Sequence, residues 1–155
     1  MLDTYIFDID GTLVNSETAV LSSLQLVLSK YFQIEKTLPE LEFSLGIPGA
    51  KIMESFDINP ELGLSYWHEE LPAFRPRMTT YPGVTKLIND LIEQDQNVAI
   101  VTSKTDEEFV DEVSRFDFTN KIQTVITASK TTKHKPNPEP LLLALTELAV
   151  PASQA

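Results

Sequence analysis

At 155 residues, the chain is long enough for one compact domain, or for a small core with an inserted unit. Its 23 acidic residues outnumber the 12 basic ones, and the net charge of -11 argues against a general nucleic-acid-binding protein. The apolar stretches are too short to cross a bilayer, no export segment is evident and cysteine is absent. We therefore expect a cytoplasmic protein without disulfides and without membrane association.

The N-terminal part begins with a strand-like segment and continues into helical patterns. Residues 4–10 have the composition of a buried strand that ends in two acids. Apolar residues then recur at helical spacing over residues 16–31, with Asn15 or Ser16 available as the N-cap. The stretch that follows holds short helical patterns broken by prolines and no alternating strand pattern. We interpret residues 15–80 as a small all-helical insert.

Strands and helices alternate in the remainder of the chain. Thr105 and Glu108 have the spacing of a capping box, which predicts the start of a helix there. The predicted elements are a helix over residues 84–92, a strand over 97–102, a helix that buries Phe109, Val110, Val113 and Phe116, a strand over 122–127, and a helix that begins at Asn137 and Pro138 and carries Leu141, Leu142, Leu145 and Leu148. This alternation predicts a parallel sheet with helices on both faces, and functional groups at the carboxyl ends of its strands.

Asp8 and Asp10 lie at such an end, two residues apart. In an extended chain this spacing points both carboxylates to the same side, about 6.5–7 Å apart. Close carboxylates repel each other, and without cysteine or clustered histidine the oxygen ligands favour Mg²⁺ as the bound cation. Gly11 allows a tight turn, in which the Gly11 and Thr12 amides could receive phosphate oxygens. The alternative is a pair of turn-initiating or capping aspartates.

Two further groups follow later strands. Thr102 and Ser103 come at the end of the 97–102 strand, where a hydroxyl could hold a phosphoryl oxygen or cap the next helix. Lys135 lies after the 122–127 strand and just before a helix, where its ammonium could reach the same edge or remain a solvated surface charge. Acids, a hydroxyl and a lysine at the ends of successive strands together favour a single site.

These segments resemble the motifs of the haloacid dehalogenase superfamily, in its phosphoglycolate phosphatase and beta-phosphoglucomutase-like branch. The first motif is similar to Asp8-Ile9-Asp10-Gly11-Thr12-Leu13-Val14-Asn15-Ser16-Glu17, the second to Tyr81-Pro82-Gly83-Val84 together with Val98-Ala99-Ile100-Val101-Thr102-Ser103-Lys104, and the third to Lys135-Pro136-Asn137-Pro138-Glu139-Pro140. The resemblance covers essentially the whole chain. It implies a Rossmann-like α/β core over residues 1–14 and 81–155, with residues 15–80 as a helical cap that selects the substrate.

The resemblance also implies a magnesium-dependent phosphatase that acts on a small phosphorylated metabolite through an aspartyl-phosphate. Asp8 would be the nucleophile and Asp10 the general acid and base, and both would bind Mg²⁺, Asp10 through its backbone carbonyl. Thr102 and Lys135 would orient the phosphoryl oxygens. The expected substrate-binding residues are Gly11, Thr12, Ser103 and Gly46, the last in the loop formed by residues 45–49 of the cap.

The family has a fourth, acidic motif after a further strand, and the chain ends at Ala155 without one. In the fold that the chain resembles, that strand pairs beside the first strand, so its absence would leave the 4–10 strand as an apolar sheet edge. We therefore expect a shortened chain, or self-association in which a partner supplies the strand. The alternatives are a sugar-phosphate mutase, a catalytically impaired fragment, and a phospho-accepting receiver-like module.

Overall fold

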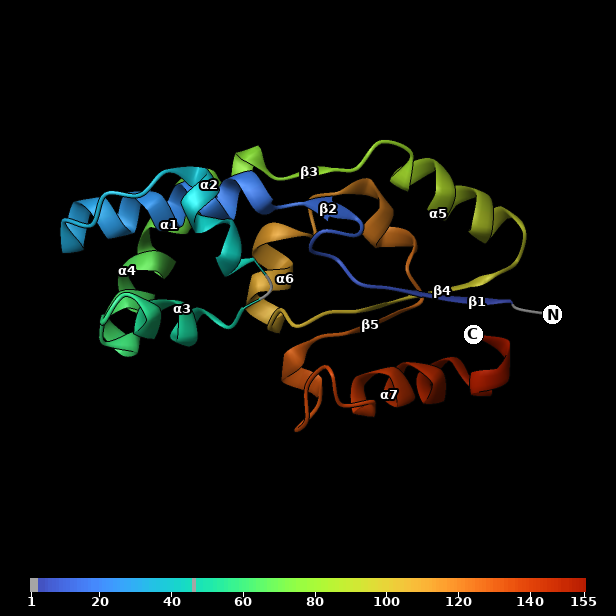
Figure 1. Ribbon diagram of the computed structural model, residues 1–155. Helices are drawn as coiled ribbons and strands as arrows, with labels where there is room; N and C mark the ends of the chain where they lie inside the picture. Colours follow the sequence, from blue (N-terminus) through green and yellow to red (C-terminus); the bar gives the residue numbers. More distant parts are fainter. Residues whose placement is uncertain (1–2, 46) are drawn as a thin grey trace. The chain divides into compact units, whose positions relative to one another are not determined.

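The computed structural model describes residues 3–45 and 47–155. The chain divides into two compact units, which are described here one at a time (Figure 1). The first, the core unit, comprises Met1–Asn15 and Thr80–Ala155, and the second, the helical unit, comprises Ser16–Thr79. Two short paired strands, β2 (Val14–Asn15) and β3 (Thr79–Thr80), lie where the chain leaves and re-enters the core unit.

A parallel sheet forms the centre of the core unit. It contains β1 (Thr4–Phe7), β4 (Asn97–Val101) and β5 (Thr124–Ile126) in the order β1-β4-β5. Thr4 pairs with Asn97 and Phe7 with Ile100, so the two strands end side by side. β4 lies between the other two and is an almost continuous apolar run, as a strand covered on both faces requires. β1 is an outer strand of this described sheet, and Tyr5 is 37% exposed.

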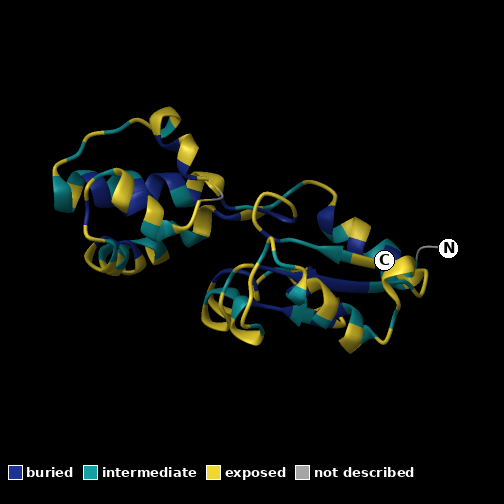
Figure 2. Ribbon diagram, turned by 60° about the horizontal axis from the view of Figure 1, so that its bottom comes forward, coloured by how far each residue is buried: buried dark blue, intermediate teal, exposed yellow. Residues whose placement is uncertain are grey.

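Helices cover both faces of this sheet. α5 (Val84–Glu93) lies above it and α7 (Glu139–Leu148) below it in Figure 1, and both contact the strands. α6 (Asp106–Glu112) follows β4. A buried apolar cluster joins β4, β5 and α7 through Ala99, Val101, Ile126 and Ala144. Most of β4 is buried and therefore dark blue in Figure 2. The predicted α/β core with a parallel sheet is confirmed.

One detail of the predicted helices is wrong, namely the burial of Val110. The capping box of Thr105 and Glu108 is present, but α6 ends at Glu112 and leaves Val110 61% exposed. Glu112, an acid, is instead 2% exposed. In α7 the buried residues include Ala144, whereas Leu142 is 54% exposed. The apolar pattern located both helices but misjudged the burial of Val110 in α6.

The helical unit contains four helices among its described residues: α1 (Glu17–Phe32), α2 (Leu38–Leu41), α3 (Gly49–Ser55) and α4 (Pro60–Glu70). Short 3-10 segments follow at Glu42–Ser44 and Leu71–Arg77. Its buried cluster includes Leu24, Leu28, Met53 and Trp67, from α1, α3 and α4. Trp67 Nε1 donates to the buried Ser23 Oγ at 2.8 Å, which satisfies the one polar group of the indole.

The described helices include none that is both long enough and apolar enough to cross a membrane.

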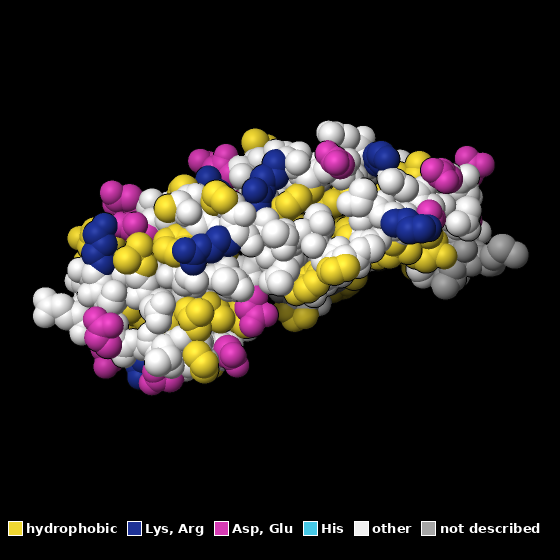
Figure 3. All heavy atoms as spheres, turned by 90° about the horizontal axis from the view of Figure 1, so that it is seen from above, with side chains coloured by type: hydrophobic (Ala, Val, Ile, Leu, Met, Phe, Trp, Pro, Cys, Tyr) yellow, Lys and Arg dark blue, Asp and Glu magenta, His cyan; other side chains and the backbone are white. Residues whose placement is uncertain are grey.

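On the face shown in Figure 3, acidic side chains are scattered among Lys and Arg and do not gather in one patch. The excess of acid is therefore spread over the solvated surface on this face.

Candidate active site

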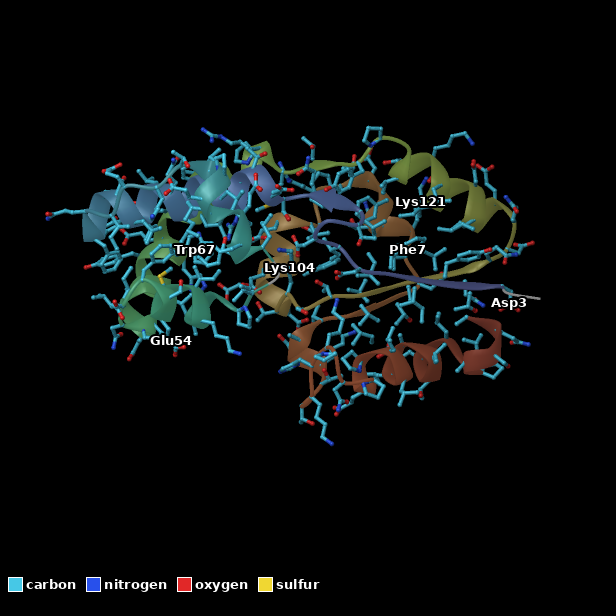
Figure 4. The ribbon with its side chains drawn as sticks, in the orientation of Figure 1. Asp3, Phe7, Glu54, Trp67, Lys104 and Lys121 are labelled. Carbon is cyan, nitrogen blue, oxygen red and sulfur yellow. The ribbon has the colours of Figure 1, made fainter. Side chains whose placement is uncertain are left out.

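The candidate site lies at the carboxyl edge of the core sheet. Asp8 follows β1 directly, Thr102 follows β4, and Lys135 lies in the loop between β5 and α7. Figure 4 labels Phe7, the last residue of β1, and Lys104, in the loop after β4. Because parallel strands point the same way, three segments that are distant in sequence end at one edge.

Asp8 and Lys135 form an ion pair across this edge. Lys135 Nζ lies 2.8 Å from Asp8 Oδ1 and also donates to the backbone oxygen of Val101 at 3.3 Å. The side chains are 30% and 43% exposed for Lys135 and Asp8, so solvent reaches both. The ammonium is thus held by the ends of β1 and β4 together. The structure brings these two predicted site residues into contact.

Asp10 pairs with a different lysine. Lys104 Nζ lies 3.1 Å from Asp10 Oδ2 and 2.6 Å from Glu112 Oε2. The Glu112 side chain is 3% exposed, that of Lys104 13% and that of Asp10 41%. Burial acts to lower the pKa of Lys104, but the charges of Asp10 and Glu112 outweigh it, so the pKa is raised. Lys104 therefore remains an ammonium between two carboxylates.

Thr102 is buried, and its backbone N–H donates to Ile126 O at 2.9 Å, which ties the end of β4 to β5. Its Oγ1 accepts the backbone N–H of Lys104 at 3.2 Å. An accepting hydroxyl still has its own hydrogen to donate, so this contact is compatible with a bond to a phosphoryl oxygen. Ser103, the next residue, is exposed.

The turn amides of Gly11 and Thr12 are paired within the turn, whereas unpaired amides were expected. Gly11 has φ 74°, which requires glycine-like freedom and agrees with the predicted tight turn. However, the Gly11 N–H donates to Val14 O at 3.0 Å and the Thr12 N–H to Ile9 O at 3.1 Å. Both amides are used within the turn, and the binding of substrate by Gly11 and Thr12 stays a prediction. Gly46 lies outside the described residues.

A magnesium site was predicted at the two aspartates. Among the described residues, no three His, Asp or Glu side chains are grouped so as to hold a metal ion. Asp8 and Asp10 nevertheless supply the hard oxygen ligands that Mg²⁺ takes, and this ion usually uses one or two carboxylates together with water and phosphate oxygens. The donor set therefore fits Mg²⁺ in kind, with Asp8 and Asp10 as the residues that would hold it.

Sequence reasoning gave no role to Lys104 of this cluster and missed Glu112. It occurs in the acidic run of α6, where a solvated helix face is the ordinary expectation. Its spacing of eight residues from Lys104 is a weak signal, because it depends on how the loop before α6 turns. Only the folded chain shows the two charges paired.

Fold and site together define a parallel α/β enzyme core with two lysine-paired carboxylates at the carboxyl edge of its sheet. The sequence matches the family described as haloacid dehalogenase-like hydrolase over residues 5–155, and the chain therefore belongs to this family of hydrolases. The predicted resemblance is confirmed.

Individual relatives agree with this. A candidate pyrophosphatase, PpaX, of Clostridium perfringens is 28% identical over 157 residues, which cover 100% of this chain and 73% of the relative. The structure of a candidate phosphoglycolate phosphatase from Lactobacillus plantarum superposes with a TM-score of 0.84 at 25% identity, covering 97% of this chain and 73% of the other. A candidate beta-phosphoglucomutase from Thermotoga maritima has a TM-score of 0.81 at 24% identity over 97% and 72%, and this likeness bears on the fold.

Proposed function

We propose that the protein hydrolyses a small phosphorylated metabolite in two steps, through a phosphorylated Asp8. The observation that carries this is the Asp8–Lys135 pair, which joins a carboxylate and an ammonium 127 residues apart at one edge of the sheet. A carboxylate oxygen there is a nucleophile, and the ammonium beside it offers a cation for phosphoryl oxygens.

In the first step an oxygen of Asp8 attacks phosphorus, the bond to the leaving oxygen breaks, and Asp10 gives that oxygen a proton. In the second step water attacks the same phosphorus while Asp10 takes its proton. The bond to Asp8 then breaks and inorganic phosphate leaves. Lys135 and the Thr102 hydroxyl hold the phosphoryl oxygens throughout. Mg²⁺ bound by Asp8 and Asp10 would neutralise charge between the phosphate and the nucleophile.

The names of two relatives indicate which phosphate compounds to test. Relatives named as a pyrophosphatase and a phosphoglycolate phosphatase support inorganic pyrophosphate and phosphoglycolate as substrates to test. Sugar phosphates join them because of the motif resemblance described in the sequence analysis. We assign selection among them to the helical unit, because the core residues described above recognise only the phosphoryl group. A mutase shares the same first step and differs in which acceptor enters.

The test is release of inorganic phosphate from a panel of phosphoglycolate, sugar phosphates and pyrophosphate, with and without Mg²⁺. Asp8→Asn is the control, because an amide of the same shape is a poor nucleophile. We expect Mg²⁺-dependent turnover in the wild type and none in Asp8→Asn. Turnover that survives in Asp8→Asn would remove the nucleophile assignment. A folded wild type that releases no phosphate would favour a catalytically impaired chain.

A further inference from the structure

A second charged cluster lies beside the proposed nucleophile. It is the Glu112–Lys104–Asp10 chain, in which one ammonium contacts a buried carboxylate at 2.6 Å and a half-exposed one at 3.1 Å. The proposed reaction uses only its outer end, Asp10. The inner two residues are costly to bury, since each charge loses its hydration. We therefore ask what the buried Glu112–Lys104 pair does for Asp10, the exposed residue of the cluster.

Lys104 is held in place along its backbone as well as at its tip. Its N–H donates to Thr102 Oγ1 at 3.2 Å, and its carbonyl accepts the N–H of Ala128 at 2.8 Å. The next residue, Thr105, is the N-cap of α6 and forms a capping box with Glu108. The same short helix that begins here carries Glu112 at its end. The backbone of Lys104 is therefore held in place by hydrogen bonds, and its side chain is held by the buried Glu112.

The exposed fraction of the side chains increases along the cluster. It rises from 3% at Glu112 through 13% at Lys104 to 41% at Asp10. A pair that served stability alone would be complete with Glu112 and Lys104. The additional contact to Asp10 links the buried charge to the carboxylate that lies nearest solvent. Each of the two aspartates of the site thus has its own lysine, Lys135 for Asp8 and Lys104 for Asp10.

We propose that Lys104, anchored by the buried Glu112, is a positioning residue that fixes the carboxylate of Asp10 for proton transfer. The inference rests on the proposed function of Asp10. Lys104 holds one oxygen of that carboxylate, Oδ2, and a carboxylate has a second oxygen with which to give and take a proton. Without the lysine, Asp10 would lose the contact that fixes its Oδ2, and the fraction of carboxylates aligned with the leaving oxygen would fall.

The experiment compares two phosphate esters with Lys104→Met. p-Nitrophenyl phosphate has a leaving group that departs without protonation, whereas an alkyl phosphate needs the proton from Asp10. Since kcat/KM reports the first phosphoryl transfer, we expect Lys104→Met to lower it for the alkyl ester by about 10- to 100-fold more than for the aryl ester. Lys104→Arg restores part of this difference. Lys86→Met, which removes an exposed lysine paired with Asp90, leaves both rates unchanged.

Equal losses for the two esters would overturn the proposal, as would a Lys104→Met variant that behaves like Lys86→Met. Removal of Lys104 leaves Glu112 buried without its lysine, so the variant could fail to fold. The double variant Lys104→Met/Glu112→Gln removes that charge and provides the same comparison. Equal losses for the two esters in this double variant would likewise overturn the proposal.

A second measurement is independent of turnover. Urea unfolding of Asp10→Asn, Lys104→Met and their combination gives the coupling between the two residues. We expect a coupling of more than about threefold in the unfolding equilibrium constant, because independent sites scatter by only about twofold. A coupling within that scatter would overturn the positioning role even in an inactive chain. A wild type that hydrolyses neither ester while the coupling persists would count against the proposed function and leave the Lys104–Asp10 link supported.

Discussion

Replacement of Lys135 by methionine separates a catalytic ion pair from a structural one. The Nζ–Oδ1 distance is 2.8 Å, but both side chains are partly exposed, at 30% and 43%. Coulomb's law in water gives about 1.5 kcal/mol at such a distance, and exposed pairs contribute only about 0–1 kcal/mol after screening and side-chain entropy. The free energy of unfolding should therefore fall by less than about 1 kcal/mol in Lys135→Met, a shift of only a few degrees in Tm.

The effect on turnover should be much larger. If Lys135 meets phosphoryl oxygens, its loss removes one preorganised charge from the transition state, which costs about 2.7–4 kcal/mol or about 100- to 1000-fold in kcat. Phosphate release and thermal unfolding of the same preparation measure both quantities. Lys133→Met is the matched control, because Lys133 is exposed and lies two residues earlier in the same loop.

Two outcomes would refute this reasoning. Lys135→Met could retain kcat within about threefold of the wild type, which would make the lysine a surface charge beside Asp8. Alternatively, Tm could fall far enough that the unfolded fraction accounts for the lost activity. The contact would then be structural, and the phosphoryl-binding role would have to pass to another cation.

Two further predictions concern the helical unit. Hydrogen bonds from the Thr37 backbone and hydroxyl, with a further one from Lys36, lower the pKa of Glu40 from 4.5 to about 2. A lowered folded-state pKa stabilises the native state above about pH 4.5, and this contribution is lost as the pH falls towards 2. Urea unfolding over that range should show a weaker acid dependence in Glu40→Gln, and an unchanged dependence would contradict the assignment. Gly63→Ala should lower Tm, because its Cβ would lie 2.5 Å from Met53 Sδ and 3.0 Å from Ile58 Cγ2. Met53 is fully buried, so overpacking of about 1–3 kcal/mol outweighs a gain in helix propensity of at most about 1 kcal/mol. Gly49→Ala is the control, since its closest contact at 2.7 Å is the end of the flexible Leu64 side chain, and equal losses in the two variants would refute the argument.

Local patterns were sufficient to predict the core. The run from Asn97 to Val101 is apolar and short, and the amphipathic pattern after Gly83 is clear, so a strand and a helix were predicted where β4 and α5 occur. The acids of the site were found by the same logic, because carboxylates at the end of an apolar strand need an explanation. Each of these features is determined by residues that are close together in the sequence, so the sequence alone is enough to predict it.

The errors arose where a residue's environment depends on how the folded chain closes around it, which the order of residue types does not show. The free amides expected at Gly11 and Thr12 required knowledge of how the turn closes on Ile9 and Val14. To predict that Glu112 is buried and Val110 exposed, one would need to know that Lys104 lies beside Glu112 in the folded chain. A helical pattern ranks side chains by hydrophobicity, and a charge can enter the interior only when a specific partner compensates for its lost hydration. That partner is not visible in the pattern.

The two lysines of the site differ in a way that bears on their roles. Lys135 is 30% exposed and contacts only the end of the sheet and Asp8 in the bonds described, so it can turn toward an arriving phosphate at little cost. Lys104 is 13% exposed and bound to a carboxylate that is itself 3% exposed. Moving Lys104 toward a ligand would break its pair with this buried carboxylate, and breaking a buried pair costs about 3–5 kcal/mol. The accessible lysine is therefore the one suited to follow the phosphoryl group, and the buried one is suited to hold Asp10 still while the proton moves.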